Sequence, residues 1–215
     1  MYEILTDMLN LHNEIYSFIK PPNEMKTITL NLILLFAAAM LVFSSCKKDK
    51  DNEPVKNIVT LGAQSNTTHG AFLSVSEKKV YKQADASAVS EKIDILCFYE
   101  EAGGNNMAIA APGTGISDIY TGETAPENWA TKNQTYFTDP STEITVAQFD
   151  QLKDGDAIIQ SYYDETVTSG NRKKKDMKVD DIYAFKTASG TYGLFKVTAV
   201  EQGTTGLVTF EFKTK

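Results

Sequence analysis

The stretch that decides the fold is IYAFKTASGTYGLFKVTAVEQGTTGLVTFEFK, residues 182–213. It predicts three strands, at 182–187, 192–200 and 207–213, separated by turns that contain glycine. Apolar and polar side chains alternate along each strand, which predicts an antiparallel meander with one apolar face against a core. The apolar face gathers Tyr183, Phe185, Phe195, Val197, Ala199, Val208, Phe210 and Phe212, and the polar face gathers Lys196, Thr198, Thr209, Glu211 and Lys213.

Shorter segments upstream repeat the β-rich pattern. The run IDILCFYE at 93–100 is almost continuously apolar, which favours a strand buried on both faces. Two helices are predicted, one at 83–92 and one after Thr145, where Thr145 and Gln148 match a capping box. The remaining predicted strands are 57–61, 71–75, 79–81, 107–110 and 157–163.

Two longer segments, 113–142 and 166–178, are rich in turn formers and polar residues and are predicted loops. The expected fold class is therefore α+β and β-dominated: an antiparallel sheet with a C-terminal three-stranded meander and two short helices. A helix-poor β-sandwich is the alternative.

A lipoprotein leader is indicated by residues 25–46, MKTITLNLILLFAAAMLVFSSC. Lys26 supplies the positive start, and two serines precede Cys46, which would carry the lipid. The apolar run 28–43 is shorter than the roughly 20 residues that a membrane-spanning helix needs. This favours a cleaved signal peptide, with an uncleaved anchor as the alternative.

The chain accordingly divides into four parts. Residues 1–24 are acidic and are interpreted as an extension from a start codon placed too early, with translation beginning at Met25. Residues 25–45 are the signal peptide, and 46–56 are the lipidated cysteine and a charged tether. Residues 57–215 are expected to form a single globular domain.

Composition limits the classes of partner. The 215 residues carry a formal net charge of −7, and removing the two lysines and four acidic residues before Cys46 leaves −5 for the mature chain. A nucleic-acid binder should be strongly basic, so none is expected. Cys97 lies in an apolar run and is interpreted as a buried hydrophobic residue without a disulfide partner.

Several short motifs together resemble cell-envelope lipoproteins of Bacteroidota that carry an uncharacterised domain. They are FSSC at 43–46, LGAQ at 61–64, GAFL at 70–73, Trp129 with Asn133 and Thr135, YAFKT at 183–187 and YGLFKV at 192–197. The resemblance implies a protein anchored in the outer membrane through a lipid on Cys46, on either its periplasmic or its outer side. It implies no catalytic residues.

Catalytic and metal chemistry find little support. His69 is the one histidine of the predicted domain, and no Gly-x-Ser-x-Gly turn is present for a nucleophilic serine. One histidine and one buried cysteine do not make a zinc site, so no metal and no cofactor are expected. The basic run 172–175 could hold an anionic polymer or lipid headgroup, although such a run is usually solvated.

Carboxylates are abundant, and a pair of them could support a small hydrolase. The sequence does not show their separations, and aspartates in turns explain most of them without calcium binding. The candidates are Asp94, Glu100, Glu101, Asp154, Asp156, Asp164, Glu165, Asp180 and Asp181.

The leading ligand-binding candidates are aromatic residues in or beside the long loop: Trp129, Tyr120 and Tyr136, with Asn133 beside them. Sugar-binding surfaces combine aromatic rings with amide hydrogen bonds. The alternative is that Trp129 folds back onto the core. We expect a non-enzymatic, lipid-anchored envelope protein, with a glycan as the first expected ligand. A structural or protein-interaction subunit of a surface assembly comes second, and a carboxylate hydrolase third.

Overall fold

The computed structural model describes residues 56–215. The predicted leader, Cys46 and most of the tether lie outside the described residues, and the lipidation of Cys46 remains a prediction. Within 56–215, no helix is long and apolar enough to cross a membrane.

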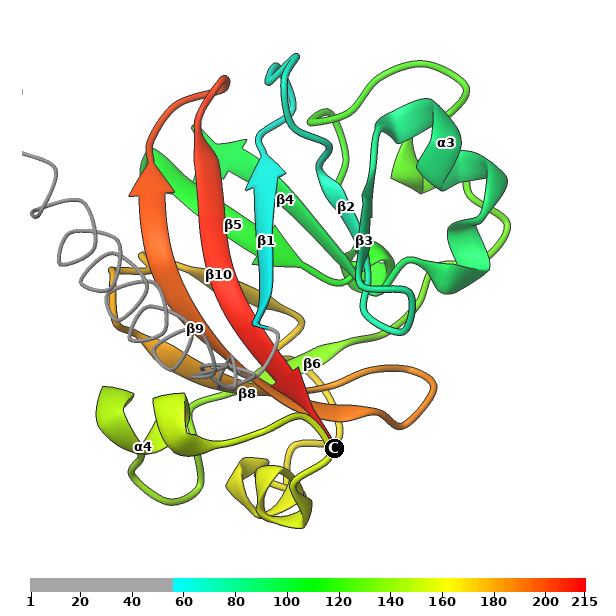
Figure 1. Ribbon diagram of the computed structural model, residues 1–215. Helices are drawn as coiled ribbons and strands as arrows, with labels where there is room; N and C mark the ends of the chain where they lie inside the picture. Colours follow the sequence, from blue (N-terminus) through cyan, green and yellow to red (C-terminus); the bar gives the residue numbers. More distant parts are fainter. Residues whose placement is uncertain (1–55) are drawn as a thin grey trace, which may run out of the picture. The chain divides into compact units, whose positions relative to one another are not determined.

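Ten strands form two antiparallel five-stranded sheets (Figure 1). The first sheet has the order β1-β10-β9-β8-β6, and the second has the order β3-β2-β4-β5-β7. The strands of the first sheet are β1 (Asn57–Gly62), β10 (Leu207–Thr214), β9 (Tyr192–Glu201), β8 (Ile182–Lys186) and β6 (Tyr136–Thr138). Those of the second are β3 (Lys79–Tyr81), β2 (Phe72–Ser74), β4 (Ile95–Glu100), β5 (Asn106–Ala110) and β7 (Lys173–Lys175). The predicted β-dominated α+β fold is confirmed, and the two sheets adopt the sandwich arrangement.

The meander forms the centre of the first sheet. Tyr183 pairs with Phe195, and Phe195 pairs with Phe212, in the register that the alternation predicts. Burying this apolar face against the second sheet makes the main core, because every second side chain of a strand points to the same side. The core includes Leu61, Leu73, Ile95, Cys97, Ile109, Phe137, Phe185, Phe195, Val208, Phe210 and Phe212.

The edges of the two sheets lie against each other. β1 lies beside β3 and β4, and the N–H of Gly62 donates to the carbonyl of Gly70 at 2.9 Å. On the other side β6 lies beside β7, and the N–H of Phe137 donates to the carbonyl of Asn171 at 2.8 Å. The sandwich is therefore partly closed, which protects the edges from pairing with another chain.

Helices and loops cover the outer faces. On the second sheet, helix α3 (Gln83–Ala88), η2 (Ser90–Lys92), η3 (Pro112–Thr114) and η4 (Pro126–Asn128) accompany a cluster around Phe72 and Trp129. On the first sheet, α4 (Val146–Gln151) and η5 (Ala157–Tyr162) cover a cluster around Phe149. The predicted capping box of α4 is confirmed: the Thr145 hydroxyl accepts from the N–H of Gln148, whose side chain accepts from the N–H of Thr145.

Three predicted segments differ in the structure. Most of the segment 157–163, predicted as a strand, forms the 3₁₀ helix η5 (Ala157–Tyr162), because Ile159 and Tyr162 at a spacing of three turn to the same buried side. The predicted loops contain two short edge strands, β6 in 113–142 and β7 in 166–178. Three-residue strands carry too little alternation to be predicted locally, and their pairing partners are distant in sequence.

The polar face of the meander is buried where α4 lies on it. Lys196, Glu211 and Lys213 are 7%, 2% and 7% exposed. Lys196 pairs with Asp150 of α4, and Lys213 Nζ lies 3.5 Å from Glu211 Oε1. Alternation predicts the face of these residues correctly but not their burial, because a helix from elsewhere in the chain covers them.

Candidate functional site

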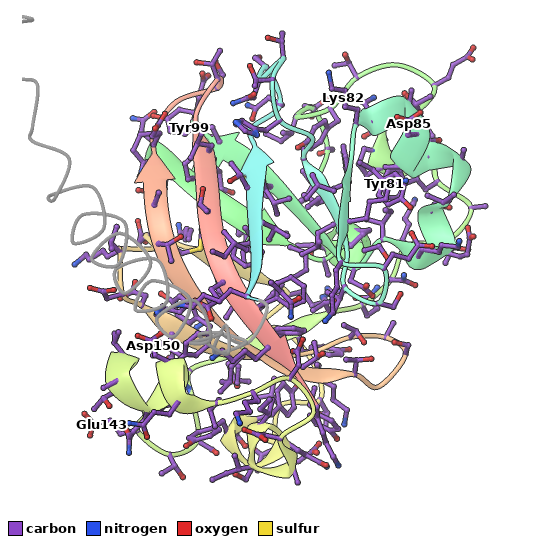
Figure 2. The ribbon with its side chains drawn as sticks, viewed as in Figure 1. Tyr81, Lys82, Asp85, Tyr99, Glu143 and Asp150 are labelled. Atoms are coloured by element: carbon purple, nitrogen blue, oxygen red, sulfur yellow. The ribbon has the colours of Figure 1, made fainter. Side chains whose placement is uncertain are left out.

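A cavity of about 250 Å³ opens directly after β1, between the 63–70 loop, β2 and the start of α3. We call it the loop cavity. Figure 2 labels Lys82 at the start of α3, at the end of the domain where this loop lies. The cavity is lined by Ala63, Gln64, Asn66, Thr67, His69, Gly70, Ala71, Phe72, Lys82, Gln83 and Tyr120. Most of these residues carry hydrogen-bonding side chains, and they come from segments that are distant in sequence.

The 63–70 loop is held by the amide of Asn66. Asn66 Oδ1 accepts from the backbone N–H groups of Thr68 and His69 at 3.0 and 2.8 Å, an Asx-type turn. Its Nδ2 donates to the carbonyl of Thr205 at 2.8 Å. A Cβ at position 62 would lie 2.6 Å from Asn66 Cβ, so only glycine fits there. These contacts place His69 at the cavity without using its ring.

Gln64 forms the inner wall. Its Nε2 donates to the carbonyl of Tyr99 at 3.0 Å, and its Oε1 accepts from the N–H of Tyr99 at 2.8 Å. The side chain therefore acts like an additional strand residue that pairs with the end of β4, where Figure 2 labels Tyr99. Both of its polar atoms are occupied, so Gln64 shapes the cavity.

The outer wall is formed by Lys82 and Gln83. Lys82 Nζ donates to the carbonyl of Thr67 at 3.0 Å, across the cavity mouth. Gln83 Nε2 donates to the carbonyl of Thr121 at 2.8 Å and to the hydroxyl of Thr124 at 3.0 Å. The side-chain amide oxygen of Gln83, Oε1, and the ring of His69 form no hydrogen bond within the described chain. Both groups retain their capacity to bind a ligand.

The floor is aromatic and largely closed. Phe72 is 0% and Tyr120 6% exposed, with ring centroids 4.9 Å apart. The Tyr120 hydroxyl donates to the carbonyl of Cys97, and burial raises the pKa of this phenol well above its usual value. Tyr120 thus forms part of the floor with its hydroxyl group already bound to the chain.

Trp129 lies behind this floor and does not form an exposed platform. It is 5% exposed, its ring centroid lies 5.3 Å from that of Phe72, and its indole N–H donates to the carbonyl of Thr124 at 2.8 Å. Trp129 folds back and caps the outer core of the second sheet, which is the alternative that the sequence leaves open for this residue. The large apolar ring and a satisfied N–H favour burial.

The other two candidate residues lie apart from the loop cavity. Asn133 Nδ2 donates to the carbonyls of Glu91 and Ile93, both at 2.9 Å, and so fastens the long loop to the η2 turn. Tyr136 begins β6 on the other sheet, opposite Lys186. The structure therefore brings together Tyr120 and Trp129, but not Asn133 or Tyr136.

The cysteine, the possible metal ligands and the basic run 172–175 do not form a reactive site within the described residues. Cys97 is buried and unbridged as predicted, and burial raises the pKa of its thiol. Residues 56–215 contain no group of three His, Cys, Asp or Glu side chains suited to a metal ion. The basic run is engaged internally: Lys173 pairs with Glu100 at 2.6 Å and Lys174 with Asp139 at 2.9 Å.

Asp94 is the carboxyl group whose pKa is raised, from 3.8 to about 6, mainly by burial. The N–H of Val75 donates to its Oδ2 at 2.9 Å and partly offsets this shift. Asp94 does not line the loop cavity. It therefore contributes no acidic group to this site.

Nothing in the sequence indicates that Gln64, Lys82 and Gln83 line the same cavity as Tyr120. The polar loop before Gly70 was a signal for a functional segment, but nothing in it indicates that α3 and residue 120 lie opposite.

The fold and site define a two-sheet antiparallel domain with a small polar cavity at one end of the sandwich. No protein-family model matches the chain, and no curated protein is significantly similar to it. One similar solved structure is a DUF4466 family protein from Parabacteroides merdae ATCC 43184, with 16% identity and a TM-score of 0.42. The match covers 75% of this chain and 54% of that chain, so this chain spans about half of its length. The neighbour is a Bacteroidota protein with a domain of unknown function, and at this similarity no residue role is transferred.

Proposed function

We propose that this chain is a lipid-anchored protein of the cell envelope, attached to the outer membrane through Cys46, and that its domain binds glycans at the loop cavity without catalysing a reaction. The leader pattern around Cys46 supports the anchor. The lining of the loop cavity supports the ligand class.

The observation that carries the proposal is the unused hydrogen-bonding capacity at this cavity. Three side-chain groups that line this space of about 250 Å³ have no hydrogen-bond partner within the described chain. They are the ring of His69, the hydroxyl of Thr67 and the amide oxygen Oε1 of Gln83. That volume is slightly below the roughly 300–1,000 Å³ of drug-sized pockets. It suits one terminal sugar, whose hydroxyl groups need several directional partners.

The position of the cavity agrees with an anchored receptor. The tether would join the domain at Asn57, the first residue of β1, whereas the cavity begins at Ala63, which directly follows the last residue of β1. A six-residue strand is about 20 Å long. The cavity therefore lies one strand length from the point at which the anchor joins the domain.

The two other functions have weaker support. A structural subunit that assembles by strand pairing needs a free sheet edge, but β1 and β6 lie against strands of the second sheet. The large exposed apolar side chains Ile58, Ile158 and Val179 belong to three different segments. A hydrolase needs paired carboxyl groups in a cleft, one of them with a raised pKa. Asp150 and Asp154 line one small cavity together, but hydrogen bonds to lysines help to lower the pKa of both, and Asp94, whose pKa is raised, does not line that cavity.

Affinity electrophoresis in gels that contain single polysaccharides tests the proposal. We expect at least one polysaccharide to retard the protein, and His69→Ala and Gln83→Ala each to reduce the retardation. Tyr136→Ala is the matched control, because it changes another candidate aromatic residue away from the cavity. Loss of retardation in Tyr136→Ala alone would place the site elsewhere, and no retardation by any glycan would contradict glycan binding.

A further inference from the structure

The ionisable groups that line the loop cavity are unusual for this protein. Lys82 and His69 are basic, Tyr120 is a buried phenol, and no carboxylate is among the lining residues. The mature chain, by contrast, has five more acidic than basic residues. The charged side chains that line the cavity are therefore basic, although the net charge of the mature chain is negative.

Lys82 is well placed to meet an anion. Its side chain is exposed, and Nζ donates one hydrogen bond, at 3.0 Å, to the carbonyl of Thr67. An ammonium group has three donors, so two remain for a ligand. The nearest acidic residue along the chain, Asp85, is exposed on α3 and does not line the cavity. None of the ion pairs found on the described domain involves Lys82.

His69 adds a second donor that lines the same cavity as Lys82. Its backbone is fixed by Asn66, as described above, while its ring is free of hydrogen bonds within the described chain. An ammonium and an imidazole N–H that face one small space are suited to the two oxygens of a carboxylate. The neutral amide of Gln83 and the hydroxyl of Thr67 suit the hydroxyl groups of the same sugar.

We propose that the loop cavity selects an acidic sugar, with the carboxylate of a terminal uronic acid held by Lys82 and His69. This inference rests on the proposed glycan-binding function and adds the chemical class of the ligand. Because the charged partners are near the surface, the carboxylate contributes more to selectivity than to total affinity, and its contribution falls with salt.

Calorimetric titration of the full chain in detergent with tetragalacturonate and its methyl ester tests the inference, since the two probes differ only in their carboxylates. We expect at least tenfold tighter binding of the acid at low salt. Lys82→Gln should reduce this preference severalfold, because it should weaken binding of the acid much more than binding of the ester. Lys79→Gln is the matched control, because Lys79 lies on the neighbouring β3 over the ring of Tyr81 and does not line the cavity.

The outcomes separate the two proposals. Equal binding of acid and ester, or an unchanged preference in Lys82→Gln, would overturn the selection of an acidic sugar and leave glycan binding intact. Binding of neutral polysaccharides with no binding of tetragalacturonate would do the same. Failure of every polysaccharide to bind would contradict the proposed function itself.

Discussion

Lys213 Nζ donates a hydrogen bond of 2.8 Å to the backbone carbonyl of Phe149, which joins the last strand of the meander to helix α4. The same ammonium group lies 2.5 Å from the carbonyl of Leu152 and 4.7 Å from the centre of the Phe149 ring. The last carbonyls of a helix lack the usual partner four residues on, although that of Phe149 also accepts from the N–H of Leu152 at 3.1 Å. A lysine near the C-terminus also interacts favourably with the helix dipole. A buried side chain of the sheet thus completes the end of the helix.

Lys213→Met should lower the free energy of unfolding by about 3 kcal/mol, because it removes the cation nearest to the buried Glu211 and the donor to two backbone carbonyls. Urea denaturation of the domain from Lys47 onwards measures the change. The double variant with Glu211→Gln should recover part of the loss, since the buried carboxylate that has lost its nearest cation is then neutral. A change below about 0.5 kcal/mol in Lys213→Met would show that the network contributes little.

Asp94→Asn should stabilise the protein above pH 6. The pKa of Asp94 rises from 3.8 in the unfolded chain to about 6 in the fold. The folded state therefore binds the proton more tightly, and the wild type loses stability as the pH rises from about 4 to about 6. At about 1.4 kcal/mol per pH unit the loss is on the order of 2–3 kcal/mol.

Urea denaturation at pH 4 and pH 7.5 checks this prediction. The variant should be more stable than the wild type at pH 7.5 and nearly equal to it at pH 4, because asparagine keeps an acceptor for the N–H of Val75. A difference that is the same at both pH values would contradict the account of Asp94.

Gly193→Ala should destabilise the meander by about 2 kcal/mol through overpacking. A Cβ at this position would lie 2.2 Å from Cζ of Phe185, its partner on β8, and 2.9 Å from the carbonyl of Lys213. Thermal unfolding measures the effect, and Phe185→Leu in the same chain should relieve part of it. A fully stable Gly193→Ala would contradict this packing.

The fluorescence of Trp129, the single tryptophan of the chain, should be blue-shifted and poorly quenched by iodide. Its burial beside Phe72 keeps water and ions from the indole. Urea should shift the emission to the red and expose it to quenching. Strong quenching in the folded state would show that the ring faces solvent after all.

The meander was predictable because alternation over three strands leaves one register that places Phe185, Phe195, Phe210 and Phe212 together on the buried face. Strands β6 and β7 were not, since pairing with β8 and β5 creates them. The site was harder still. Whether an aromatic residue in a loop packs inward depends on what it meets, and Trp129 meets Phe72 of β2.

Mapping of backbone amide NMR shifts during titration with a polysaccharide that retards the protein tests the central claim most directly. We predict that the shifts concentrate at Thr67, His69, Gly70 and Gln83, and that Tyr136 and Tyr192 on the other sheet are unaffected. Shifts that cluster at those tyrosines, or that leave the 63–70 loop unchanged, would contradict the assignment of the loop cavity as the glycan-binding site.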